Sequence, residues 1–418
     1  MATHPRVAPA ARVPLRPWHF ILAFGVISLL ADMVYEGARS IIGPYLAMLG
    51  ASATLVGLAA GAGEFIGYGL RVVSGYAVGR TRHYWAWTIL GYALTVLSVP
   101  LIGATGVLAP ALVLYATERL GKAVRSPAKD TLLSHASAQT GRGSAFGVHQ
   151  ALDQTGAMLG PMLLAAVLAW NHGDYRLAFA ALIVPGVLVL ALLGWLRWRV
   201  PNPLQYEQSE HSDASPDAPD GASDAPVSRR LPRRFWVYVA TVAFLSLGVA
   251  PFPLLAFHAE TRGLLSDPLV PVVFAVAMAT DGLSGLVVGR LYDRAGPLVL
   301  LIVPVAAAAG ALAFAESTPL VWIGVAIWGI TNGILDSTVK AVVTELVPST
   351  SRAVGFGWLA FVRGCSLLVA GGVLGAAYSA GAGVAMTLVV TANVLGFIAL
   401  FAVLRRIPHV PRSRATPS

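Results

Sequence analysis

One segment restricts what this chain can fold into more than any other. Leu108–Asp130 has the length of a membrane span, yet its second half is rich in charged residues. On a helix that turns about 100° per residue, the charged side chains fall within one arc of about 140°. These residues are Glu118, Arg119, Lys122, Arg125, Lys129 and Asp130. Each charge at the centre of a bilayer costs at least roughly 2.5 to 3.5 kcal/mol, so this helix needs neighbours that supply counter-charges or an aqueous cavity.

The rest of the chain is apolar enough to supply membrane-embedded neighbours. Of its 418 residues, 56% are hydrophobic and 12% are charged. Soluble proteins average about 45 to 50% apolar and about 25% charged residues. A net charge of +9 would suggest nucleic acid in a soluble protein, but here it reflects the sidedness described below, so no nucleic-acid partner is expected. The composition predicts a polytopic protein whose main partner is the lipid bilayer.

Apolar runs of about 20 residues, broken by Gly, Pro or charge, predict twelve spans. The first six are Trp18–Leu46, Ala53–Ala77, Tyr84–Ala104, Leu108–Leu133, Gly143–Trp170 and Tyr175–Trp198. The second six are Phe235–Ala259, Pro268–Leu291, Pro297–Phe314, Pro319–Leu346, Arg352–Tyr378 and Gly383–Leu404. The twelve helices therefore fall into two sets of six.

The segment between the two sets is acidic, rich in Pro, Ser and Asp, and without apolar periodicity. Such a composition predicts a disordered cytoplasmic linker. The expected organisation is a tail at 1–17, a six-helix bundle at 18–199, the linker at 200–231, a second bundle at 232–405 and a tail at 406–418.

Basic residues are distributed unequally between the two sides of these spans. Of the 29 Lys and Arg residues, 20 lie in segments or span ends assigned to the cytoplasm, 2 lie on the outer side and 7 lie in the interior of spans. This is a strong positive-inside signal. It predicts a multi-pass protein of the cell membrane with both termini in the cytoplasm.

The two halves resemble each other in sequence. The stretch Ser74–Arg80 matches Val288–Arg294 at an offset of 214 residues, and Arg142–Gly147 matches Arg352–Gly357 at an offset of 210. Two matches at nearly one offset indicate a duplicated six-helix unit.

Two motifs resemble those of the major facilitator superfamily. The first, Gly289-Arg-Leu-Tyr-Asp293-Arg294-Ala-Gly296, is similar to the loop signature G-x-x-x-D-R-x-G of that superfamily. Its first-half counterpart departs from the signature, with Gly79 in place of the acid and Arg82 in place of the second glycine.

The second motif lies in the fifth predicted span. It contains Gly147, Gly156, Gly160 and Pro161, and it is similar to a signature of proton-coupled antiporters among drug and metabolite exporters. Leu164 and Ala165 stand where that signature ends in two glycines. Small residues let helices approach closely and proline bends a helix, so the alternative interpretation is that these residues only pack one helix on another. Arg119 is a weaker match to an arginine of the fourth helix in the same superfamily.

The resemblance implies an all-α integral membrane fold, with twelve transmembrane helices in two pseudo-symmetric six-helix bundles. It also implies alternating access around a central cavity lined by the first and fourth helices of each half. Cavity candidates from those helices are Tyr35, Arg39, Glu118, Arg119, Lys122, Asn332, Asp336 and Lys340. The first half should carry most of the charge.

A proton-driven carrier needs a carboxyl group whose surroundings change between two states. Burial disfavours the ionised form and a nearby cation favours it, so an acid that exchanges one environment for the other binds and releases a proton. The candidates are Asp32, Glu36, Asp153 and Glu64. The alternative is a static set of ion pairs. Gating or conformational roles are expected for Arg125, Gly147, Gly156, Gly160, Pro161, Gly289, Asp293, Arg294 and Gly296.

These features together predict a monomeric secondary transporter that exports a small organic molecule in exchange for protons. A proton-coupled importer of an anionic or zwitterionic metabolite is an alternative, since the charged helix is mostly basic. A metal-cation exporter is less favoured, because the chain has one cysteine and few intramembrane histidines. No nucleophile elbow, phosphate loop or metal-ligand pair is recognisable, so neither an enzyme nor a cofactor is expected.

Overall fold

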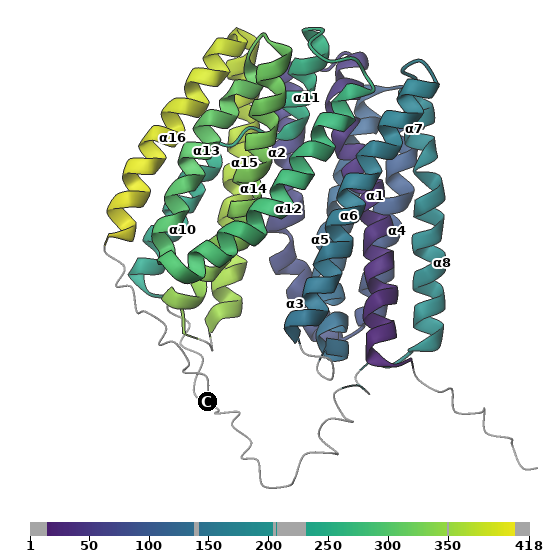
Figure 1. Ribbon diagram of the computed structural model, residues 1–418. Coiled ribbons are helices and arrows are strands. Elements are labelled where there is room, and N and C mark those ends of the chain that lie inside the picture. Colours follow the sequence, from purple (N-terminus) through teal and green to yellow (C-terminus); the bar gives the residue numbers. More distant parts are fainter. Residues whose placement is uncertain (1–14, 138–141, 204–205, 207–230, 349–350, 406–418) are drawn as a thin grey trace, which may run out of the picture.

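The computed structural model describes residues 15–137, 142–203, 206, 231–348 and 351–405, apart from some side chains within helices. The predicted tails at 1–17 and 406–418 and the predicted linker at 200–231 therefore lie almost wholly outside the described residues. The part of the chain that is described is helical throughout, without a strand (Figure 1).

The first half forms six spans, two of which are interrupted. Its helices are α1 (Pro17–Met48), α2 (Ala53–Gly69), α3 (Arg71–Thr81), α4 (Tyr84–Thr105), α5 (Leu108–Ser137), α6 (Arg142–Trp170), α7 (Tyr175–Ala181) and α8 (Ile183–Arg199). The helix pairs α2–α3 and α7–α8 each form one span with a break, at Leu70 and Leu182. Pro185 explains the second break, because it has no N–H to continue the hydrogen-bond ladder of the preceding turn.

The second half repeats this arrangement. Its elements are α10 (Arg233–Leu247), α11 (Phe252–Thr261), α12 (Leu269–Ala295), η1 (Gly296–Leu301), α13 (Ile302–Gly310), η2 (Ala311–Phe314), α14 (Thr318–Leu346), α15 (Arg352–Ala380) and α16 (Ala382–Leu404). The helices α10 and α11 form one span broken near Pro251. The elements η1, α13 and η2 together form another.

The twelve predicted spans are confirmed, with ends that differ by a few residues. Ten of the helical segments are long and apolar enough to cross a membrane by composition alone. The remaining two are α5, which is too charged for that criterion, and the short apolar segment Leu298–Phe314. α5 is therefore identified as a span by its place among the other eleven and not by its own hydropathy.

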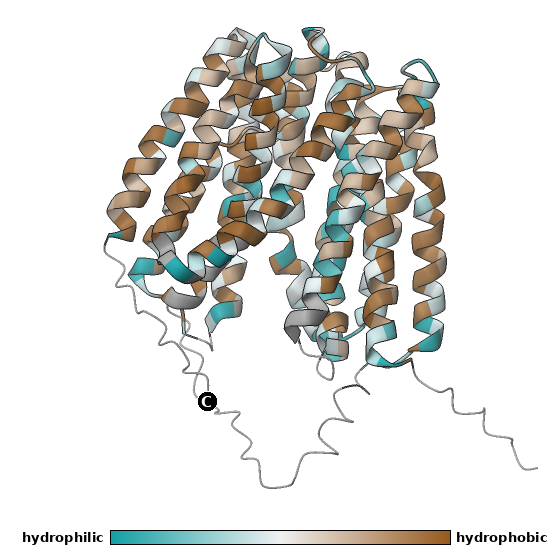
Figure 2. Ribbon diagram, in the orientation of Figure 1, coloured by the Kyte–Doolittle hydropathy of each residue, from teal (hydrophilic) through white to brown (hydrophobic). Residues whose placement is uncertain are grey.

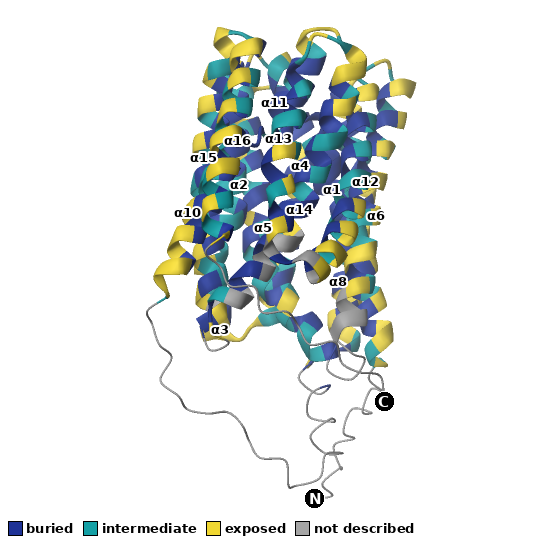
Figure 3. Cartoon of the chain, turned by 60° about the vertical axis from the view of Figure 1, so that its left-hand side comes forward, coloured by how far each residue is buried: buried dark blue, intermediate teal, exposed yellow. Residues whose placement is uncertain are grey.

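Each half has its own apolar core. One cluster of buried residues runs from Phe20 to Tyr206, and a second consists almost entirely of residues between Phe235 and Leu404. Hydrophobic residues predominate along the outer helices α8 and α16, whereas hydrophilic residues gather along α5 (Figure 2). Exposed residues follow the outer surfaces of the bundle and buried ones its interior (Figure 3). This distribution suits a bundle surrounded by lipid with a polar centre.

The ends of the bundle differ in how the two halves meet. We call the end that carries Pro17, Arg199, Arg233 and Leu404 the terminal face, and the other end the opposite face (Figure 1). The ribbons of the two halves converge toward the opposite face and diverge toward the terminal face.

Direct contacts join the halves near the opposite face. The hydroxyl of Tyr175 donates to Asp267 at 2.9 Å, and the hydroxyls of Thr54 and Ser379 lie 3.0 Å apart. A Cβ added at Gly43 would overlap the backbone oxygen of Pro253, so α1 and α11 touch there without room for a side chain. The opposite face is therefore the closed end of the structure.

The two copies of the loop signature end in similar backbone conformations. Gly296 has φ of 70° and follows the last residue of α12. Arg82, its first-half counterpart, has φ of 54° and follows the last residue of α3. Positive φ suits glycine and costs other residues roughly 1 to 2 kcal/mol. The first half therefore has the same turn as the second half, with an arginine in place of the glycine. The side chain of Asp293 lies outside the described residues.

Candidate functional site

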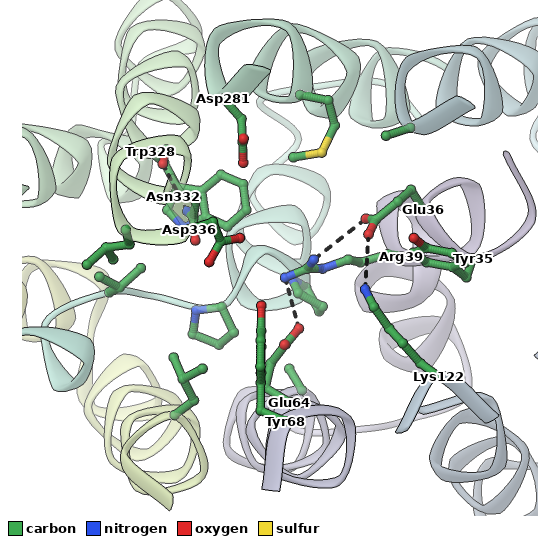
Figure 4. A pocket seen from close by; sticks show the side chains of 18 of the residues that line it. Tyr35, Glu36, Arg39, Glu64, Tyr68, Lys122, Asp281, Trp328, Asn332 and Asp336 are labelled. Atoms are coloured by element: carbon green, nitrogen blue, oxygen red, sulfur yellow. Dashed lines mark hydrogen bonds and ion pairs between the residues drawn. The ribbon is translucent and has the colours of Figure 1, made fainter. Parts of the chain in front are cut away.

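A cavity of about 210 Å³ lies between the two halves. It is lined by α1, α2, α5 and α6 of the first half and by α10, α11, α12, α14 and α15 of the second. Its described charged residues are Asp32, Glu36, Arg39, Glu64, Lys122, Asp153, Asp281, Asp336 and Arg363. Six of these nine belong to the first half, which agrees with the expected asymmetry. Figure 4 shows the side chains of six of them converging on the space between the bundles: Glu36, Arg39, Glu64, Lys122, Asp281 and Asp336.

A chain of ion pairs forms one wall of the cavity. Arg39 lies 3.6 Å from Glu36 and 3.0 Å from Glu64, which connects α1 to α2. Glu64 also lies 3.7 Å from Arg119 of α5. Lys122 completes the arrangement at 3.7 Å from Glu36 (Figure 4). The charged face of α5 is therefore neutralised by carboxylates of α1 and α2, as its cost in a membrane requires.

Arg119 lies behind this wall rather than on it. Its side chain is 1% exposed, and its Nε donates to Glu118 Oε2 at 2.6 Å. Neither residue lines the cavity, so the sequence-based placement of Glu118 and Arg119 on the cavity surface was wrong. The physical reason is that α5 packs against α2 and α4, and its first charged turn points into that interface. Arg119 contacts the cavity wall through Glu64 and through the ring of Tyr115.

A second polar cluster lies beside the first, on α1, α5 and α6. Asp32 is 4% exposed and lies one turn before Tyr35 on α1. Asp153 also lines the cavity, and its Oδ1 is buried with no hydrogen-bond partner in the described part of the chain. Among the described residues, no Arg, Lys or His nitrogen lies within 4.0 Å of either carboxylate. Asp32 and Asp153 thus differ from Glu36 and Glu64, which are ion-paired.

Cations near this cluster make other contacts. The Arg125 guanidinium lies over the rings of Tyr92 and Tyr35, at 4.5 and 5.0 Å from their centroids. Lys129 Nζ lies 3.2 Å from His149, whose ring lies 3.4 Å from the Ser28 hydroxyl. Arg125 is 3% exposed and does not line the cavity. It holds α1 against α5 and α4.

The second half presents a different surface to the cavity. Arg363 of α15 donates to Asp336 of α14 at 2.6 Å. Asp281 of α12 accepts a bond of 3.5 Å from the side-chain nitrogen of Gln154, which crosses from the first half. Trp328 and Asn332 of α14 line the cavity together with Asp281 (Figure 4). A Cβ added at Gly333 of α14 would overlap the backbone oxygen of Asp281, so α12 and α14 touch at this point. No described cation lies within 4.0 Å of Asp281.

The structure brings together most of the residues predicted from sequence to form the site. Asp32, Tyr35, Glu36, Arg39, Glu64, Lys122, Asp153, Asn332 and Asp336 all line the cavity. The side chain of Lys340 lies outside the described residues.

Several lining residues were not predicted, among them Tyr115, Gln150, Gln154 and Arg363. Arg363 had a usable signal, since it is an intramembrane arginine with no acid one or two turns away on its own helix. The sequence contained no comparable signal for Tyr115, Gln150 or Gln154.

The glycines of the fifth-span motif pack helix on helix. A Cβ at Gly156 would overlap the backbone oxygen of Leu29, and one at Gly160 would overlap that of Met33. Both contacts join α6 to α1. Gly147, by contrast, has open space where a Cβ would be. The close approach positions Asp153 on α6 next to Asp32 on α1, so the motif serves the site through its geometry.

The sequence profile of the Major Facilitator Superfamily matches residues 24–371. This chain belongs to that superfamily. An uncharacterised protein of Mycobacterium tuberculosis is 44% identical over 405 residues, which cover 97% of each chain. An uncharacterised MFS-type transporter of Methanocaldococcus jannaschii is 23% identical over 367 residues, covering 85% of this chain and 87% of that protein.

Solved structures confirm the major facilitator fold. A nucleoside transporter superposes with a TM-score of 0.69 at 11% identity, covering 92% of this chain and 98% of its own. A bacterial homologue of the human lysosomal transporter Spinster, in an inward-facing and occupied conformation, gives 0.70 at 18% identity, covering 94% and 97%. The protein is thus a multi-pass membrane transporter of the major facilitator type, and its cavity occupies the interface between the two bundles.

Proposed function

We propose that this major facilitator protein is a proton-coupled antiporter that exports a small organic molecule by alternating access. The observation that carries the proposal is the pair of cavity carboxylates, Asp32 and Asp153, that no described cation accompanies within 4.0 Å. A carboxyl group in such a place binds a proton when its surroundings become apolar and releases it when water or a cation arrives. Glu36 and Glu64 are held by ion pairs and serve to stabilise the charged wall.

The groups that face Asp32 and Asp153 come from three helices. Tyr35 and Glu36 share α1 with Asp32, and Arg125 approaches both acids from α5. Lys129 of α5 and His149 of α6 face Asp153. Arg125 is now held by two tyrosine rings. A small rotation of α5 against α1 would move this guanidinium toward the acids or away from them. Such a movement gives the change of environment that coupling requires.

The proposal places the terminal face in the cytoplasm. The uneven distribution of basic residues supports this orientation. The contacts at the opposite face then close the external side, and the cavity serves the cytoplasm in this state. For each net charge that crosses per cycle at 100 mV, the membrane potential provides about 2.3 kcal/mol, enough for a substrate gradient of roughly fifty-fold. That driving force is adequate for export.

Reconstitution in liposomes that contain a pH-sensitive dye tests this proposal. With an imposed proton gradient, charged and neutral amphiphiles are added in turn. Proton movement opposite to the substrate supports export by antiport, whereas movement in the same direction supports the importer of an anionic or zwitterionic metabolite. A metal-cation exporter would respond to divalent ions instead. No proton movement with any compound would contradict the proposal.

The variant Asp32→Asn should abolish proton movement while the protein remains folded and monodisperse. Glu316→Gln is the matched control, because Glu316 is an exposed acid paired with Arg262 outside the cavity. It should leave the flux unchanged. Intact coupling in Asp32→Asn, and again in Asp153→Asn, would show that protons bind elsewhere.

A further inference from the structure

We infer that the transported molecule is an organic cation whose positive group binds between Asp281 and Trp328 on the second-half wall of the cavity. This inference rests on the proposed function and adds the class of substrate to it. It follows from which charged groups and aromatic rings of the cavity already contact other side chains of the protein.

The cavity has more negative than positive charge. Its described lining residues include six carboxylates and three cations. All three cations, Arg39, Lys122 and Arg363, lie within 4.0 Å of a carboxylate. An anionic substrate would have to displace one of these pairs and would leave a buried charge without its partner, which is strongly unfavourable. The basic character of α5 therefore does not indicate an anion site.

Three carboxylates in the cavity have no described cation within 4.0 Å: Asp32, Asp153 and Asp281. The first two lie together on α1 and α6 and are assigned to protons above. Asp281 belongs to the other bundle and accepts one long hydrogen bond from Gln154. It is therefore the acid best placed to meet a substrate charge without occupying the proton site.

The aromatic residues of the cavity point to the same wall. Lys122 lies over Tyr35 at 4.4 Å, Arg363 over Tyr68 at 5.3 Å and Arg119 over Tyr115 at 5.5 Å, each measured to the ring centroid. Trp328 is the remaining aromatic side chain among the described lining residues, and no described cation lies over its ring.

Trp328 is also held in place. Its Nε1 donates to the backbone oxygen of Ala250 at 2.8 Å, and its ring packs against Phe252 with centroids 5.6 Å apart. A fixed indole beside a carboxylate is a favourable environment for an ammonium or pyridinium group, because indole is the ring that attracts cations most strongly. Met278 and Leu335 line the cavity as well and offer apolar surface to the rest of the molecule.

The test is a binding measurement on the purified full-length protein with three compounds of matched shape. These are N-methyl-phenylpyridinium, which is always cationic, phenylpyridine at an alkaline pH where it is neutral, and biphenyl carboxylate, which is anionic. Isothermal titration should give the order cation, neutral compound, anion, from tightest to weakest. Tightest binding of the anion, or no binding of the cation, would overturn the inference.

Variants then locate the site. Asp281→Asn should weaken binding of the cation by about tenfold or more, as expected for loss of a charge-assisted contact, and should leave the neutral compound unaffected. Asp281→Glu should restore much of the affinity, which guards against a folding defect. Trp328→Leu should weaken binding of the cation several-fold. Trp322→Leu on the same helix and Glu316→Gln should leave this affinity unchanged. Unchanged affinity in Asp281→Asn would place the cation elsewhere and refute the assignment.

The binding and flux measurements can refute the cation site and the proton coupling separately. A protein that exchanges protons for a neutral or anionic compound would support the proposed antiport and refute the cation site. A protein that binds the cation through Asp281 but moves no protons would refute the coupling and retain the site.

Discussion

At the scale of single residues, Glu64 connects more of the site than any other acid described. It lies within 4.0 Å of Arg39 on α1 and Arg119 on α5, so it joins three helices. Removing one partner from a buried ion pair leaves an uncompensated charge, and the loss exceeds what the pair itself contributes. A site of this kind depends on which acid meets which base as much as on the number of charges.

Glu64→Gln should therefore destabilise the protein by roughly 3 kcal/mol, because the buried Arg119 and the half-buried Arg39 lose a shared carboxylate. Thermal unfolding in detergent, followed by the fluorescence of the tryptophans, measures the effect. The control is again Glu316→Gln, which should leave the melting temperature unchanged because the pair it removes is exposed. An unchanged melting temperature in Glu64→Gln would mean that the ion-pair chain contributes nothing to folding.

Much of the site at this scale could be predicted from sequence, but its pairing could not. Helical periodicity alone placed Asp32, Glu36 and Arg39 on one face of α1. Whether Glu36 or Asp32 would hold a cation depends on the side chains of other helices, and local periodicity carries no information about those. The same limit explains why Arg119 was assigned to the cavity surface and Arg363 was overlooked.

At the scale of elements, the packing of α6 on α1 sets the distance between the two proton-binding candidates. The backbones touch at Gly156 and Gly160 without space for a Cβ. The spacing of these glycines indicated close helix packing from sequence. The partner helix and the acid that the contact positions became apparent only in three dimensions.

Gly156→Ala should push α6 away from α1 and cost roughly 1 to 3 kcal/mol through overpacking. Gly147→Ala lies on the same helix with open space around it, so it should leave stability unchanged or raise it slightly through better helix propensity. Melting temperatures of the two variants in the same detergent provide the comparison. Equal effects at both positions would contradict the close α1–α6 contact.

The end of α3 offers a second prediction at this scale. Arg82 has φ of 54° at the position where the second half has Gly296. Arg82→Gly should relieve strain and stabilise the protein by up to about 1 kcal/mol, after allowance for the greater freedom of glycine in the unfolded chain. Arg80→Gly, within the last turn of α3, should destabilise it by a similar amount. A lower melting temperature for Arg82→Gly would indicate that this arginine makes a contact that outweighs its conformation.

At the scale of the whole molecule, the proposed alternating access requires the contacts at the opposite face to open. Length, hydropathy and the internal repeat were enough to predict twelve spans and two bundles, because these features arise from the bilayer and from the duplicated sequence. The conformational state could not be predicted in this way, since two arrangements of the same helices differ little in free energy. The structure shows one of them.

A disulfide across the closed end should stop turnover. Thr54 and Ser379 have hydroxyls 3.0 Å apart on α2 and α15, and Cys365 is the only native cysteine. In a Cys365→Ser background, Thr54→Cys with Ser379→Cys should cross-link on mild oxidation. Substrate flux should fall to background and return after reduction. Either single variant serves as the control. Full flux in completely cross-linked protein would contradict opening at this face.

The proposed antiport requires Asp32 and Asp153 to couple protons to substrate, and one measurement tests this coupling most directly. In proteoliposomes of Asp32→Asn, substrate exchange at equal pH and uptake driven by a proton gradient are recorded on the same preparation. The account predicts that exchange persists while gradient-driven uptake disappears, because the cavity can still alternate but no longer carries the proton. Gradient-driven uptake at the parent rate, or the loss of both activities in a folded protein, would contradict it.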